Sequence, residues 1–189
     1  MKKFKSIALA LVVVLSTVAV SAQTKKVDAA KSSIIWTGKK VTGSHEGTIN
    51  LKDGNLVFKG KTVVGGTFNV DMTSMTVTDL KAGQGKEKLE GHLKADDFFG
   101  TDKHEIATLL FKKVSIKSPN VYTVNGDLTI KGITKPVTFE LATTVNTALA
   151  NVKIDRTKYD IKYGSGSFFD NLGDKAINDN FDLAVSLKF

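Results

Sequence analysis

The chain has 189 residues, 41% of them hydrophobic and 24% charged, and its formal net charge is +8. This length suits one domain with a substantial core. Arg156 is the only arginine, whereas recognition of phosphates and guanine edges normally recruits several, so we expect no nucleic acid partner. The sequence has no cysteine, which excludes disulfides, zinc thiolates and thiol catalysis.

The first residues have the layout of a secretory signal. The basic opening MKKFK precedes an apolar run over residues 7–20, and the small residues Ser21 and Ala22 follow. The run is about 14 residues long, shorter than the roughly 20 that a membrane-spanning helix needs. We expect a signal peptide over residues 1–22, cleaved near Ala22, and a periplasmic or secreted domain over residues 23–189. Loss of the three lysines of the opening would reduce the formal charge from +8 to +5.

The beginning of this domain is predicted to be sheet. Ile34 and Trp36 alternate with polar residues, which is the period of two that buries one face of a strand. Residues 47–51 alternate in the same way and lead to Asp53-Gly54, a dipeptide favoured in tight hairpin turns because it tolerates positive φ. We expect a hairpin turn there and a short return strand over residues 56–58.

The next segments change from sheet to helix and back. Gly65-Gly66 indicates a bend or a close backbone approach, and a strand is predicted to follow from Phe68 toward Val77. Leu89 and Leu93 have helical spacing among lysines and glutamates, which predicts one short helix between residues 80 and 100.

The most regular stretch covers residues 121–145. Alternation over residues 122–130 predicts one strand and alternation over residues 137–145 predicts its hairpin partner, with the turn in the KGITKP segment. Pro136 would begin the second strand, where its missing N–H does no harm. Each run is about nine residues, or about 30 Å, which is long for a strand and suits a barrel or a deep sandwich.

Three more strands are predicted at residues 107–116, 149–154 and 177–189. Residues 155–175 mix turn residues with aromatics, so we expect a long loop with a possible short helix there. The total is about eight long strands with one or two short helices, and closing them into an antiparallel up-and-down barrel is the direct way to hide their edges. The predicted fold is therefore an all-β, eight-stranded barrel.

Five stretches in this order resemble a known family: VDMTSMTV, LEGHLKADDFF, NGDLTIKGITKPV, KIDRTKYDIKYGSGSF and GDKAINDNFDLAVSL. Together they are similar to the YceI-like family of lipid or polyisoprenoid-binding proteins, and the similarity covers nearly the whole of residues 23–189. The resemblance implies a periplasmic or secreted, lipocalin-like barrel of eight antiparallel strands. It also implies an interior that takes a long isoprenoid chain, for carriage or storage without catalysis.

A set of large apolar residues shares the regular strand parities. If the barrel is hollow they line a channel for a lipid, and if it is solid they fill its core. The set comprises Trp36, Phe68, Val70, Met72, Leu128, Ile130, Phe139, Leu141, Phe181, Leu183 and Val185.

Arg156 is the candidate polar contact of such a ligand. It can meet an anionic head group, or it can pair with Asp155, Asp160 or another acid and hold the loop to the barrel. His92 and His104, with the aspartates between them, can converge on a metal or simply stay solvated at a helix end. We expect no metal, no other cofactor and no enzymatic activity, because no nucleophile elbow or phosphate-cradling glycine loop is present in the sequence.

Three functions remain open from the sequence. The first is an exported carrier of an apolar, isoprenoid-like lipid, with a transient membrane contact possible. The second is a small outer-membrane barrel, suggested by the last alternating strand that ends in Phe189. The third is an exported stress or interaction module with a solid core. The sequence does not indicate an oligomeric state.

Overall fold

The computed structural model describes residues 21–189, so nearly all of the predicted signal peptide lies outside the described residues. The strands are β1 Ala22–Lys26, β2 Ser33–Lys40, β3 Gly43–Lys59, β4 Thr62–Val77, β5 Ile106–Ser118, β6 Val121–Ile130, β7 Ile133–Thr143, β8 Thr147–Asp155 and β9 Ile177–Lys188. The helices are α1 Lys86–Lys94 and three short 3₁₀ helices, Ala29–Lys31, Arg156–Tyr159 and Gly173–Lys175.

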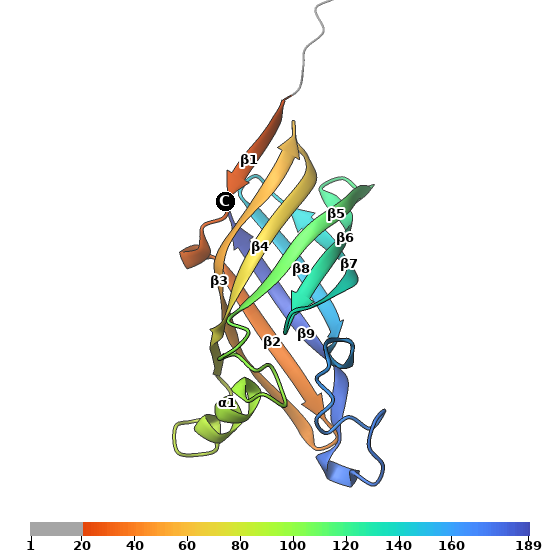
Figure 1. The fold of residues 1–189 in the computed structure, drawn as a ribbon. Helices are drawn as coiled ribbons and strands as arrows, with labels where there is room; N and C mark the ends of the chain where they lie inside the picture. Colours follow the sequence, from red (N-terminus) through yellow and green to blue (C-terminus); the bar gives the residue numbers. More distant parts are fainter. Residues whose placement is uncertain (1–20) are drawn as a thin grey trace, which may run out of the picture.

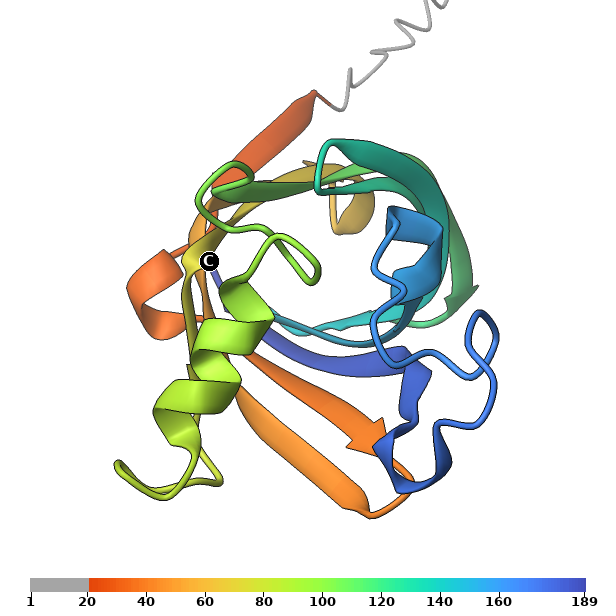
Figure 2. The same ribbon diagram turned by 60° about the horizontal axis from the view of Figure 1, so that its bottom comes forward.

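Strands β2 to β9 form a closed barrel (Figures 1 and 2). Each strand pairs antiparallel with the next one along the chain, and β9 pairs back onto β2 to close the ring. Alternate side chains of each strand therefore point into the barrel, and in β3 and β4 the inward parity changes where the register shifts. This arrangement confirms the predicted eight-stranded antiparallel barrel.

Strand β1 was not expected from the sequence, because AQTKK has no apolar alternation. It pairs with residues 55–59 of β3, while β2 pairs with residues 43–49 of the same strand. The two strands thus share one edge of β3 and are separated by the 3₁₀ helix Ala29–Lys31, whose N-terminus Asp28 caps.

The predicted hairpin turn at Asp53-Gly54 is wrong. Strand β3 runs through both residues without a break, and the pairing with β4 only shifts register between Leu51 and Asp53. The dipeptide tolerates a turn but does not impose one. A Cβ on Gly54 would lie 2.5 Å from Cδ1 of Phe68, so this glycine makes room for a ring on the neighbouring strand. The actual reversal follows Lys59.

The hairpin of β6 and β7 is confirmed, but its second strand begins at Ile133, earlier than expected. Lys131 and Gly132 alone form the turn, and both have positive φ (51° and 73°), as a two-residue type I′ turn requires. Pro136 therefore lies within β7. It is tolerated because β8 pairs only with residues 140–143 of β7, so no ladder bond is lost at the proline.

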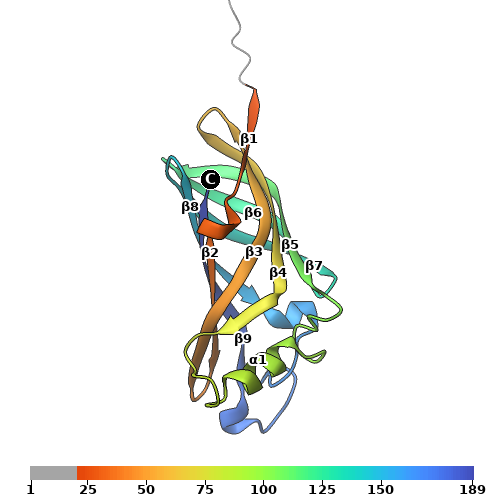
Figure 3. The same ribbon diagram turned by 90° about the vertical axis from the view of Figure 1, so that its left-hand side faces the viewer.

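The expected helix between residues 80 and 100 is α1, and it lies at one end of the barrel together with residues 156–175 (Figures 1 and 3). Viewed toward that end, α1 and the 156–175 segment flank opposite sides of the ring (Figure 2). Among residues 21–189, no helix has the length and hydrophobicity that crossing a bilayer would require.

Gly47 on β3 provides a stability test of the packing between β3 and the two strands beside it. A Cβ there would lie 1.9 Å from the Thr76 carbonyl oxygen and 2.5 Å from the Trp36 ring, both on strands paired with β3. We expect Gly47→Ala to lower the free energy of unfolding in urea by at least about 2 kcal/mol. Gly38→Ala is the control, because no atom lies within 4 Å of its Cβ position, and it should change stability by less than about 0.5 kcal/mol. Equal losses in both variants would contradict the packing described here.

Candidate functional site: an apolar cavity inside the barrel

The barrel encloses a cavity of about 180 Å³. This is slightly larger than the roughly 150 Å³ apolar cavity that admits benzene in an engineered protein. Of the side chains that line it within residues 21–189, only Arg156, Asn178 and Asn180 are polar or charged apart from the Trp36 indole N–H. A wall of this kind favours an apolar occupant, because water would find few hydrogen-bond partners there.

The cavity is closed at the end far from α1, because side chains fill the barrel there. These residues are buried but do not line the cavity: Leu56, Phe58, Val63, Tyr122, Val124 and Ala148. At the opposite end the lining includes Asn178 and Asn180, which are both exposed to solvent. The cavity is therefore a blind pocket with one mouth, which we define by Gly38, Arg156, Asn178 and Asn180.

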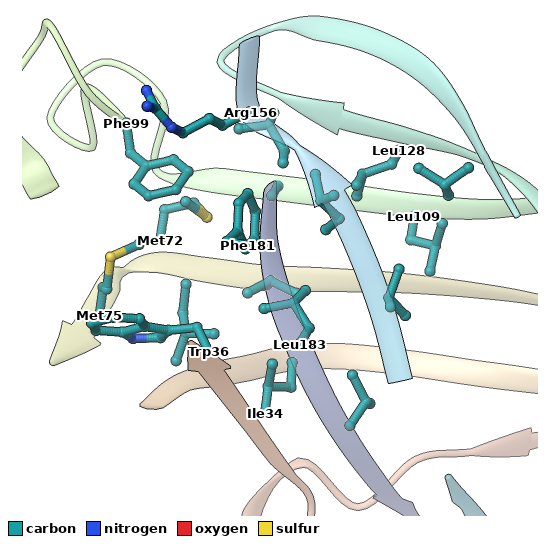
Figure 4. A pocket seen from close by; sticks show the side chains of 18 of the residues that line it. Ile34, Trp36, Met72, Met75, Phe99, Leu109, Leu128, Arg156, Phe181 and Leu183 are labelled. Carbon is teal, nitrogen blue, oxygen red and sulfur yellow. The ribbon is translucent and has the colours of Figure 1, made fainter. Parts of the chain in front are cut away.

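All twelve residues singled out in the sequence lie on the wall of this cavity. Eleven do so because the inward parity of a barrel strand points into the lumen, as Figure 4 shows for Trp36, Met72, Leu128, Phe181 and Leu183. Phe68 packs against Phe111, and Phe111 against Phe139, with ring centroids 5.4 and 5.8 Å apart. Contact between these residues and a ligand remains a prediction.

The wall also contains residues beyond these twelve. Most share the inward parity of the strands and could have been chosen on the same signal: Ile34, Ile49, Leu51, Ala107, Leu109, Phe111, Val137, Ala150, Val152, Ile154 and Leu187. Leu93, Phe98 and Phe99 come from α1 and the turn after it. Strand periodicity carries no information about that segment, although two adjacent phenylalanines after a polar helix are a signal for burial.

Arg156 lies at the mouth and is only 2% exposed at its side chain. Its Nη1 donates to the carbonyl oxygens of Ile161 and Tyr163, both at 2.8 Å, and its Nε and Nη2 donate to those of Asn178 and Ile177, both at 3.0 Å. The guanidinium therefore ties the loop after β8 to the start of β9.

The charge of Arg156 is balanced by Asp179, which is neither of the two acids that the sequence analysis named but is covered by the other acid that it allowed. Asp179 Oδ1 lies 3.8 Å from Nη2, and the guanidinium also lies 5.6 Å from the centre of the Phe98 ring. Burial lowers the pKa of Arg156, while the nearby carboxylates of Asp179 and Asp155 act in the opposite direction. With four N–H bonds already made to carbonyls, the geometry favours a structural role for Arg156 over capture of an anionic head group.

Glu90 holds α1 over the mouth end of the barrel. Its Oε1 accepts hydrogen bonds from Thr76 Oγ1 at 2.6 Å and from the backbone N–H of Val77 at 2.8 Å, both at the end of β4. These two hydrogen bonds lower the pKa of Glu90. Through this contact Leu93, on the same helix, is kept against the cavity.

A metal site does not form from the histidines and aspartates near α1. In the part of the chain that the structure describes, no three His, Asp or Glu side chains gather closely enough to hold an ion. Asp96 instead pairs with Lys103 at 2.5 Å, and His92 packs edge-on against the Tyr163 ring, with centroids 4.3 Å apart.

Replacing Arg156 with methionine tests its structural role. The substitution removes the donors to two loop carbonyls and to two carbonyls at the start of β9. We therefore expect the free energy of unfolding to fall by about 3 kcal/mol or more and protease cleavage within residues 156–175 to accelerate. Lys162→Met, at an exposed site in the same loop, should cost less than about 1 kcal/mol. A fully stable Arg156→Met protein would contradict the role assigned to these bonds.

The lowered pKa of Glu90 predicts a pH dependence of stability. Its contribution is fully present above the ordinary pKa of 4.5 and is lost as pH falls through the lowered folded-state pKa. Glu90→Gln keeps an oxygen acceptor for Thr76 and Val77 but cannot titrate. The unfolding free energy measured between pH 3 and 6 should therefore depend less steeply on pH in this variant than in the wild type, and identical slopes would refute the assignment.

Comparisons with known proteins agree with this architecture. The model of the YceI-like domain matches residues 26–189. A UPF0312 protein of Shewanella denitrificans is 32% identical over 97 residues, covering 51% of this chain and 48% of that protein. Protein YceI of Shigella flexneri is 35% identical over 95 residues, covering 50% of this chain and 46% of that protein. The chain thus spans about half the length of the curated relatives it matches.

Two solved structures share the fold. BcnA of Burkholderia cenocepacia superimposes with a TM-score of 0.69 at 21% identity, covering 85% of this chain and 98% of that one. A polyisoprenoid binding domain from Saccharophagus degradans gives 0.59 at 14% identity, covering 86% and 97%. Because the family match includes every barrel strand and the closed barrel agrees with it, the chain belongs to the YceI-like domain family.

Proposed function

We propose that this protein is an exported carrier or storage protein that holds a long apolar lipid, of the polyprenyl or quinone-like isoprenoid class, inside its barrel. The observation that carries the proposal is the blind apolar cavity with a single mouth. Such a shape takes an apolar tail inward and leaves any polar head at the mouth, where Asn178 and Asn180 meet solvent. The proposal assigns no catalytic step.

The isoprenoid class is supported by family membership and by the name of the Saccharophagus degradans domain, which describes that domain as polyisoprenoid binding. The volume of about 180 Å³ accommodates only the first part of such a chain. A longer tail must displace side chains, and Met72 and Met75 on the wall have the flexible, unbranched shape that adapts most readily.

Export rests on the signal-like residues 1–22 and is part of the proposal. The outer surface argues against insertion of the strands into a membrane, because ion pairs cross it: Lys39 with Asp182, Lys112 with Asp127, and Lys117 with Glu140. The cavity argues against a module with a solid core.

The direct test is to purify the protein from its host without adding lipid, extract it with organic solvent and identify the extract by mass spectrometry. An isoprenoid lipid in stoichiometric amount is expected. A protein that is reproducibly purified without lipid and that does not bind added isoprenoids would refute the proposal.

Trp36 provides a second test, because it is the only tryptophan and it lines the cavity. Quinone rings quench indole fluorescence at short range, so quinones with successively longer prenyl tails can be titrated directly. Burying the first one or two isoprene units should tighten the dissociation constant by at least about tenfold per unit, since each removes roughly 100 Å² of apolar surface from water. Further isoprene units should increase the affinity less, because side chains of the wall must move to admit them. Affinity independent of tail length would contradict an isoprenoid-binding cavity.

A cavity-filling variant tests whether the ligand binds inside the barrel or on its outer surface. Ala150 lines the cavity, so Ala150→Phe should fill it and weaken quinone binding at least tenfold while the protein stays folded by circular dichroism. Ala142→Phe places the same ring on the exposed face of β7 and should leave binding unchanged. Equal binding by both variants would place the ligand outside the barrel.

A further inference from the structure

Three aromatic side chains lie exposed in one short segment, residues 162–169, which we call the aromatic loop. Tyr163 is 47% exposed, and Phe168 and Phe169 are each 50% exposed. Rings of this size usually bury most of their surface, so a group of three in eight residues marks a surface that meets another apolar phase.

The aromatic loop is attached directly to the mouth of the cavity. The backbone N–H of Ile177, a lining residue, donates to the carbonyl oxygen of Gly164 at 2.7 Å. Ser167 Oγ donates to Asp179 at 2.5 Å, two residues further along β9. The rings therefore lie beside the opening through which an apolar molecule would enter.

The exposure of the rings does not come from a loosely held loop. The N–H groups of Phe168 and Phe169 both donate to the carbonyl oxygen of Ser165, at 3.1 and 3.0 Å, and Ser165 itself is completely buried. Arg156 fixes the carbonyl of Tyr163 from the other side. The backbone is thus held in a conformation that presents the two phenylalanines outward, and this pre-organisation lowers the ordering cost of binding.

The charges around the rings indicate which apolar phase fits. Residues 157–176 contain three lysines and three aspartates, so the segment is electrically neutral. Lys162 Nζ lies 5.2 Å from the centre of the Phe168 ring, on a long side chain that can keep its charge in water while the ring is buried. A neutral segment with aromatic side chains suits the interface of a zwitterionic bilayer and needs no anionic lipid.

We propose that the aromatic loop docks the protein on a neutral phospholipid bilayer with the cavity mouth facing the lipid. Docked in this way, an apolar tail passes between bilayer and cavity without crossing water. The docking is inferred from the loop alone, and only this use of it rests on the proposed lipid-binding function.

The test is flotation of the purified protein with phosphatidylcholine vesicles on a density gradient, without added ligand. The double variant Phe168→Ser/Phe169→Ser should reduce partitioning at least tenfold, since each ring has about 100 Å² left to bury. The matched control is Ile116→Ser/Val145→Ser, which removes two exposed apolar side chains from the opposite end of the barrel, where they are 66% and 87% exposed, and it should float like the wild type. Adding salt should have no effect.

Three results would overturn the docking proposal: a wild-type protein that does not float, equal losses in both double variants, or binding that requires anionic lipid and disappears in salt. A separate measurement tests the transfer step. Trp36 quenching by a prenylated quinone preloaded in the vesicles should develop at least tenfold more slowly in the phenylalanine variant, while equilibrium binding of a short water-soluble quinone stays unchanged. Flotation without any quinone binding would support docking and refute the carrier function, so the two proposals fail separately.

Discussion

The continuity of β3 is the constraint on which the barrel depends. This strand pairs with β4 along one edge and with both β1 and β2 along the other, so it joins the N-terminal strands to the rest of the ring. Had the chain reversed at Asp53-Gly54, β4 would have lost its partner and the ring would have opened. A register shift beside Asp53 absorbs the strand's bend, and Gly54 leaves space for Phe68 on β4. Side chains alternate between the inner and outer faces of the closed ring, and the inward parity of β3 changes at this shift, from Leu51 to Gly54.

Closure alone does not produce the cavity, because only one of the two ends of the barrel is filled by side chains. One end is filled by its own side chains, and the other is covered by α1 and the loop after β8, which lie outside the strand ladders. Several backbone groups at that end are hydrogen-bonded by charged side chains instead of by a neighbouring strand. Arg156 donates to four carbonyls and Glu90 accepts from the end of β4. The residues that shape the mouth are consequently polar, while the interior stays apolar.

The difference between the two ends determines where a ligand would enter in the proposed function. An apolar tail has one way in, and the group at its other end remains near Asn178 and Asn180. The aromatic loop lies at the same end and is held there by bonds to the start of β9. The opposite end instead carries strand β1 (Figure 1). Lys25 of β1 lies over the Phe58 and Phe189 rings. Entry and docking thus belong to one end of the barrel, and strand β1 lies at the other.

The sequence by itself determined that Trp36, Phe68, Leu128 and Phe181 face inward, because the period of two is a local property of each strand. It also identified the helix, the β6–β7 hairpin and the family resemblance. Tertiary structure alone decided that the chain does not turn at Asp53-Gly54, and where the barrel is filled and where it is hollow. It also decided that Arg156 binds four backbone carbonyls and pairs with Asp179. These outcomes depend on which distant strand comes to lie beside a residue, and a local pattern contains no information about that neighbour.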